Sequence, residues 1–177
     1  MVFGVLLLRV VMGLVMAGHG AQKLFGWFGG DGIKATAGFV ESLGWRPGRT
    51  FALLLGAGEF FGGLAFLLGL LTPFAAAVLI AGLATAAWAV HRPHGLWNSA
   101  GGYEYHLVLI AAALAVAWTG PGRVSLDYLF GWTIAGSLGG LLALVLGVLG
   151  WLGGLAAREW AGRRVHRPGE PTTGRMH

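Results

Sequence analysis

Residues 50–72 read TFALLLGAGEFFGGLAFLLGLLT, a run of 23 residues with a single charge, Glu59. As a helix, this run is long enough to cross a hydrocarbon core of ~30 Å. A charge near the middle of a span costs roughly 2.5–3.5 kcal/mol, so Glu59 should face a bundle interior and have a partner there. Ala52, Gly56 and Gly63 share its helical stripe, and such small residues let a second helix approach closely. Glu59 therefore belongs either to a structural ion pair or to a site that handles protons or electrons.

The composition of the whole chain is that of an integral membrane protein. Hydrophobic residues make up 56% of the 177 residues and charged residues 11%, with a mean hydropathy of +0.72. Soluble domains carry about 25% charged residues. The 33 glycines show no collagen-like period, and in membrane helices they indicate close packing. The chain has no cysteine, so it forms no disulfide and offers no thiolate for redox chemistry or metal binding.

The apolar runs predict five membrane spans. They cover approximately residues 2–23, 50–72, 74–90, 103–120 and 129–156. Between the first two, Ile33, Ala37 and Val40 repeat at helical spacing, which predicts a short amphipathic helix at the membrane interface, with Trp27 and Trp45 as headgroup-level anchors on either side. We therefore expect an all-α membrane protein: a four-helix transmembrane bundle, a fifth C-terminal transmembrane helix and an interfacial amphipathic helix after the first span.

This pattern divides the chain into three parts. Residues 1–127 form the transmembrane core, residues 128–157 add the C-terminal transmembrane helix, and residues 158–177 form a basic disordered tail. Five arginines against two glutamates from residue 158 onward place much of the net charge of +5 in this tail, so the charge does not indicate a nucleic-acid partner.

The distribution of basic residues predicts the orientation. With five spans, one side of the membrane receives Lys23, Lys34, Arg46, Arg49, Arg92 and the tail arginines, whereas Arg123 lies on the other side. Because basic residues are enriched in cytoplasmic loops, the C-terminal tail should be cytoplasmic and the N-terminus outside.

Two groups of residues are candidates for function or for buried pairing. Arg9 lies on the first span within reach of Glu59, because the two residues are about 20 Å and 13 Å along their helices from the first inter-helix loop, at 1.5 Å per residue. We predict that they form a buried ion pair. A second group gathers at one membrane face and is a candidate for binding quinone or handling protons: His19, Lys23, Glu104 and His106.

The histidines admit other interpretations. Loop histidines are usually solvated, and tryptophans occur at every bilayer interface. His91 and His94 lie in a loop, so they should matter less than His19 and His106, which lie on spans. His91-x-x-His94 also suggests a metal site, but Pro93 between them spoils the helical spacing that such sites use. We therefore predict no metal site.

Three segments together resemble the DoxX family of small bacterial membrane proteins. They are LLLRVVMGLVMAGHGAQKLFG (6–26), GAGEFFGGLAFLLGLLTP (56–73) and GGYEYHLVLIAAALAVAWTGPGRVSLD (101–127). The third is the most specific and closes on a structural motif made of Gly120, Pro121, Gly122, Ser125 and Asp127. Family helices number four, so the fifth span departs from the pattern.

The resemblance implies a role in membrane redox chemistry. DoxX proteins resemble the membrane subunit of thiosulfate:quinone oxidoreductase, and others are associated with complexes that handle oxidative and thiol stress. It implies a bacterial cytoplasmic membrane protein serving a quinone-linked oxidoreductase, with quinone as a non-covalent cofactor and a soluble oxidoreductase or sulfurtransferase as partner. A non-enzymatic membrane anchor or scaffold for a soluble partner is the alternative. Whether the chain is itself an enzyme, and whether it forms a homo-oligomer, both stay open, and no catalytic residue is assigned.

Overall fold

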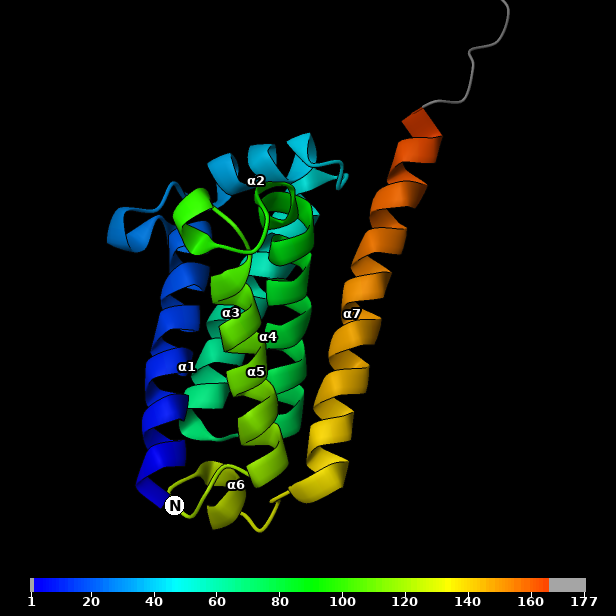
Figure 1. Cartoon of the computed structure of the whole chain (residues 1–177). Helices are drawn as coiled ribbons and strands as arrows, with labels where there is room; N and C mark the ends of the chain where they lie inside the picture. Colours follow the sequence, from blue (N-terminus) through cyan, green and yellow to red (C-terminus); the bar gives the residue numbers. More distant parts are fainter. Residues whose placement is uncertain (1, 166–177) are drawn as a thin grey trace, which may run out of the picture.

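The computed structural model describes residues 2–165, and this part of the chain is helical and contains no strand. Its helices stand side by side, with one short helix across each end of the bundle (Figure 1). They are α1 (Val2–Phe25), α2 (Gly32–Ser42), α3 (Gly48–Leu68), α4 (Thr72–Ala86), α5 (Glu104–Thr119), α6 (Leu126–Leu129) and α7 (Gly136–Val165). Short turns of 3-10 or π-helix lie at Trp27–Gly29, Ala87–His91, Arg92–His94 and Asn98–Ala100. The expected all-α membrane fold is confirmed.

Within residues 2–165, four helical segments are long and apolar enough to cross a membrane. They are Phe3–Phe25, Gly48–Leu68, Thr72–His94 and Gly136–Arg163. The fifth apolar helix, α5, has 16 residues and is about 24 Å long at 1.5 Å per residue. It nevertheless runs along the bundle, so that α1 begins and α7 ends at opposite ends of the molecule (Figure 1). The chain is a multi-pass membrane protein.

The predicted amphipathic helix is present as α2 and lies across the end of the bundle where α7 finishes (Figure 1). Trp27 is 55% exposed, as expected of an interfacial anchor. Trp45 is only 4% exposed, so its prediction as an anchor is wrong. Its indole Nε1 donates a hydrogen bond of 2.8 Å to the Gly154 carbonyl, which ties the α2–α3 connection to α7 instead.

The last helix differs in its limits from the predicted span of 129–156. Residues 126–129 form α6, and α7 begins only at Gly136 and continues to Val165. Arg158, which we assigned to a disordered tail, is therefore helical. Its guanidinium lies 5.2 Å from the Trp45 ring and 5.1 Å from the Trp88 ring, so this part of α7 packs against the bundle. The rest of the predicted tail, from residue 166, lies outside the described residues.

The small-residue stripe on α3 brings α1 into backbone contact. Ala52, Gly56, Glu59 and Gly63 are all buried. A Cβ atom on Gly63 would lie 2.5 Å from the Ala17 backbone nitrogen, so no larger side chain fits without a shift of the backbone. This close approach is the packing that small residues allow between membrane helices.

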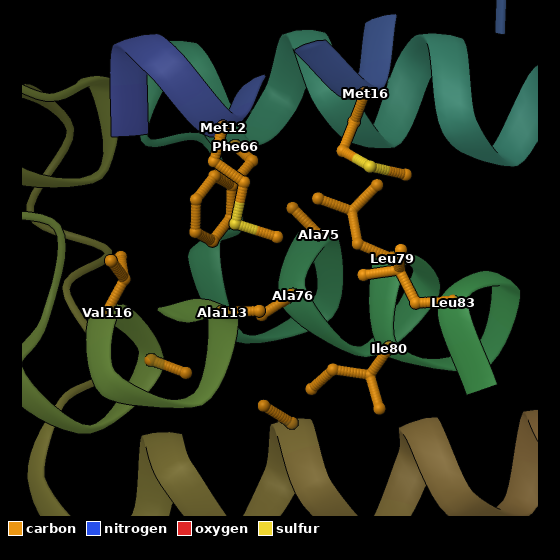
Figure 2. Close-up of a cluster of buried hydrophobic side chains, with 12 residues drawn as sticks. Met12, Met16, Phe66, Ala75, Ala76, Leu79, Ile80, Leu83, Ala113 and Val116 are labelled. Carbon is orange, nitrogen blue, oxygen red and sulfur yellow. The ribbon is translucent and has the colours of Figure 1, made fainter. Parts of the chain in front are cut away.

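Two apolar clusters hold the bundle together. The larger joins α1, α3, α4, α5 and α7, with Met12, Phe66 and Leu79 no more than 2% exposed (Figure 2). The smaller lies beneath α2 and centres on Val40 and Trp45. The two clusters do not meet everywhere. A cavity lies between them, and residues of both clusters line it.

Candidate ligand-binding cavity

A cavity of about 860 Å³ opens between the two apolar clusters. Its walls come from α1, α2, α3, α4, α5 and α7, and most of its lining is apolar. The polar side chains that line it are His19, Lys23, Asn98, Glu59, Thr85, His91, Tyr105 and His106. Small-molecule sites in proteins are typically pockets of ≈ 300–1,000 Å³ with apolar walls and a few placed polar groups.

Glu59 pairs with Lys23 inside this cavity. The Lys23 Nζ lies 2.5 Å from the Glu59 Oε2, and the two side chains are 27% and 9% exposed. The predicted pair between Arg9 and Glu59 is therefore wrong. The first two turns of α3 extend past the end of α1, so Glu59 lies level with Gly20 rather than with Arg9.

Arg9 is held at the opposite end of the bundle by backbone carbonyls. Its side chain is 1% exposed and donates to Phe66 O at 3.2 Å, Leu67 O at 2.8 Å, Pro121 O at 2.5 Å and Val124 O at 2.8 Å. The first two carbonyls belong to the last turn of α3, whose C-terminal carbonyls lack partners within the helix. Arg9 is thus a structural residue that joins α1 and α3 to the segment before α6.

The residues of the predicted structural motif around this segment also have structural contacts. Ser125 accepts a hydrogen bond from the Tyr128 backbone nitrogen and so caps α6. The Asp127 carboxylate accepts from the Leu71 and Thr72 backbone nitrogens at 2.7 and 2.9 Å, which caps the start of α4. The Gly120-Pro121-Gly122 turn ends α5, and φ is +86° at Gly120 and +82° at Gly122. None of these residues lines the cavity.

Within the described part of the chain, His106 is a buried histidine of the cavity wall with an unpaired ring nitrogen. It is 9% exposed, and its Nδ1 atom has no hydrogen-bond partner among residues 2–165. Buried polar atoms are nearly always hydrogen-bonded, and leaving one unsatisfied costs about 1–3 kcal/mol. This nitrogen is closed off from the cavity in the structure, and a rotation of the His106 ring, which lines the cavity, would bring it to a hydrogen-bonding group of a ligand.

His91 lies beside His106, with ring centroids 4.3 Å apart. We expected His91 in a loop, but α4 continues through a turn of π-helix, Ala87–His91, which carries this residue to the cavity wall. Single π-helical turns occur frequently at functional sites. His91 Nδ1 lies 2.7 Å from the Gly101 carbonyl, so Nδ1 carries the proton and a neutral ring has Nε2 as its acceptor.

The other predicted residues divide between the cavity and its surroundings. His19 lines the cavity, and its Nδ1 lies 3.2 Å from Gln22 Oε1. Glu104 does not line it: its carboxylate accepts from the Asn98 backbone nitrogen at 2.9 Å and holds the loop before α5. His94 is exposed and lies outside the lining. In the part of the chain that the structure describes, no three His, Cys, Asp or Glu residues come together as metal ligands.

The sequence profile of the DoxX family matches residues 4–92, half of the chain. The chain belongs to the DoxX family. No curated protein and no solved structure matches it. The DoxX match includes α1, α3 and α4, and therefore the Lys23–Glu59 pair and His91. It ends before α5 and α7, which complete the cavity with His106 and a glycine-rich wall.

The Lys23–Glu59 pair in this DoxX protein should contribute to stability. We expect Glu59→Gln and Lys23→Met each to lower the free energy of unfolding by about 3 kcal/mol, the lower end of the range for buried pairs, because Lys23 is partly exposed. The double variant should recover part of this loss, since it leaves no unpaired charge. Thermal unfolding in detergent measures all three variants.

The exposed pair Arg46–Glu41 is the matched control. Its atoms are 3.8 Å apart and both side chains are about half exposed. Replacing Arg46 should change the free energy of unfolding by no more than about 1 kcal/mol. Glu41 is left in place, because its carboxylate also accepts from the Gly48 backbone nitrogen at 3.3 Å. Strictly additive losses for Lys23 and Glu59 would show that the two residues do not interact.

Proposed function

We propose that this DoxX protein binds quinone in the cavity and serves as the membrane subunit of a quinone-linked oxidoreductase. The observation that carries the proposal is the buried His106 Nδ1 without a partner, next to a cluster of ionisable groups in an otherwise apolar cavity. A quinone matches this arrangement, because its carbonyl oxygens accept hydrogen bonds and its ring suits apolar walls. The volume of about 860 Å³ is sufficient for such a ligand.

The chain's own residues would bind the head group and handle its protons. A bound quinone supplies the two-electron redox chemistry, since electron carriers of this kind bring their own reactivity. After a rotation of its ring, His106 in its Nδ1–H tautomer would donate a hydrogen bond to a quinone oxygen. His91 lies between His106 and the exposed segment 92–100, so the two histidines would connect the cavity to the aqueous face. Histidine suits proton transfer because its charge changes near neutral pH.

The pair Lys23–Glu59 would set the electrostatic environment of the head group. Both residues line the cavity, and Lys23 and His19 act electrostatically on His106. A cationic Lys23 close to the quinone would favour negative charge on the head group during reduction. Glu59 would hold the Lys23 ammonium in place, because the two atoms are in direct contact.

Quinone binding by the purified protein tests the proposal. Titration with short-chain ubiquinone and menaquinone analogues should show saturable binding that excess unlabelled quinone displaces. A well-folded preparation that binds neither analogue, alone or with its neighbouring gene products, would overturn the proposal and favour a membrane anchor for a soluble partner.

We also propose that the protein lies in the bacterial cytoplasmic membrane with the end of α7 in the cytoplasm. The support is the excess of basic residues at the end of the bundle that holds α2, compared with Arg123 at the other end. A reporter fused at the C-terminus should report a cytoplasmic location, and one inserted at residues 130–135, between α6 and α7, an external location. The opposite pair of signals would contradict this orientation.

A further inference from the structure

The cavity extends across the bundle, well beyond the polar cluster. His19 and Lys23 line it from α1, whereas Gly150, Gly153 and Gly154 line it from α7. These two helices lie on opposite sides of the bundle (Figure 1). A ring bound beside His106 would therefore leave the α7 side of the cavity for another part of the ligand.

The glycines of α7 fall into two groups with different surroundings. In its first half, a Cβ atom on Gly139 would lie 2.5 Å from the Ala117 carbonyl oxygen, and one on Gly147 would lie 2.7 Å from Ile80 Cγ2. These glycines allow α7 to pack against α5 and α4. Gly153 has no atom within 4 Å of a built Cβ, and Gly154 has only Thr85 Oγ1 at 4.0 Å. Helix packing does not explain this second group, because the space beside it belongs to the cavity.

The cavity reaches the surface of the bundle between α3 and α7. Leu54 on α3 is 64% exposed and Gly153 on α7 is also exposed, although both line the cavity. Both residues lie within membrane-spanning segments, where lipid is the solvent. Closer to the end of the bundle, Arg158 Nε donates to the Leu43 carbonyl at 2.6 Å, and the Arg158 guanidinium stacks on the Trp45 ring. These contacts hold α7 against the α2–α3 connection beside this opening.

We propose that the apolar tail of the quinone lies against Gly153 and Gly154 and leaves the cavity between α3 and α7 into the bilayer. This inference rests on the proposed function and assigns the ligand class more closely: a quinone with a prenyl or alkyl tail, which enters from the lipid. It makes α7, which lies outside the region matched by the DoxX profile, a determinant of specificity. The absence of a side chain at Gly153 is what provides room for the tail.

The test compares the affinity of two quinones for the full-length protein in detergent or nanodiscs. One probe is a benzoquinone with a decyl tail, and the other is the same ring with a methyl group in its place. With each concentration counted within the detergent or lipid phase, we expect the wild-type protein to prefer the tailed quinone, because the cavity wall packs more closely against the tail than mobile lipid chains do. Gly153→Leu should reduce the affinity for the tailed quinone about tenfold and change that for the methyl analogue less than about twofold.

Gly162→Leu is the matched control. Gly162 is an exposed glycine on the same helix, has no atom within 4 Å of a built Cβ and does not line the cavity. This variant should bind both quinones as the wild type does. Thermal unfolding of both variants checks that they fold, and Gly153→Ala should show a smaller loss in the same direction.

The outcomes separate the two proposals. If the wild-type protein binds both quinones equally, or if Gly153→Leu leaves the tail preference intact, the tail does not lie against α7 and the inference is wrong while quinone binding stands. Displacement of the tailed quinone by added phospholipid alone would assign this side of the cavity to a lipid chain and also overturn the inference. If the wild-type protein binds neither quinone, both proposals fall.

Discussion

The Arg9→Leu variant is expected to lose at least about 3 kcal/mol of its free energy of unfolding, the largest effect of any substitution considered. Arg9 donates to four carbonyls from two separate segments, and each buried acceptor left unpaired costs about 1–3 kcal/mol. Asp127, which acts on Arg9 electrostatically, would also lose its nearby opposite charge. The midpoint of thermal unfolding in detergent should fall by roughly 6–12 °C.

Arg9→Lys and Arg123→Leu sharpen this test. Lysine keeps the charge but has three donors on one atom and cannot reach carbonyls on both sides, so it should recover only part of the loss. Arg123 is exposed at the same end of the bundle, and its replacement should leave the unfolding midpoint almost unchanged. An Arg9→Leu protein that melts like the wild type would contradict the structural role of this residue.

The largest effect on binding is expected for His106→Leu, which should weaken quinone binding at least about tenfold, the equivalent of one lost buried hydrogen bond. The same variant should fold as stably as the wild type or more stably. Its Nδ1 has no partner without ligand, and replacing an unsatisfied buried polar group by an apolar one is neutral or stabilising. Loss of binding with unchanged stability is the combination that a purely structural histidine would not give.

Other histidines provide the controls for this result. His94→Ala should bind quinone normally, because His94 is exposed and does not line the cavity. His91→Ala should cause a smaller loss than His106→Leu, since its Nδ1 already bonds to the Gly101 carbonyl. Equal affinities for His106→Leu and the wild-type protein would show that His106 does not contact the ligand. Glu59→Gln should weaken both binding and stability, because it leaves Lys23 without its partner.

The fold was largely predictable from hydrophobic length and residue size. An apolar run of 23 residues around Glu59 could only be a span, and its small-residue stripe could only serve close packing. The limits of α7 were less predictable, because residues 130–135 are as apolar as the helix that follows them. The stacking of Arg158 on Trp45 and Trp88, which extends that helix, depends on contacts between segments far apart in the sequence.

The candidate site was predictable in its residue types but not in its pairings. Successive spans cross the membrane in opposite directions, which places His19, Lys23 and His106 at the same end of the bundle. In the structure all three lie on the cavity wall. The offset of α3 along the axis of α1 determines whether Glu59 meets Arg9 or Lys23. This offset depends on how far the start of α3 extends beyond the end of α1, which the sequence does not show. The π-helical turn that carries His91 to the cavity has no distinct pattern either.

Photochemical cross-linking shows whether quinone binds in this cavity. Purified protein is irradiated with an azido-benzoquinone, and the modified residues are mapped by peptide mass spectrometry. Binding in the cavity predicts adducts on the α1 segment around His19 and Lys23 and on the start of α5 around His106, suppressed by excess unmodified quinone. Adducts confined to the lipid-facing side of α7 or to residues 92–97, or adducts that excess quinone does not suppress, would contradict it.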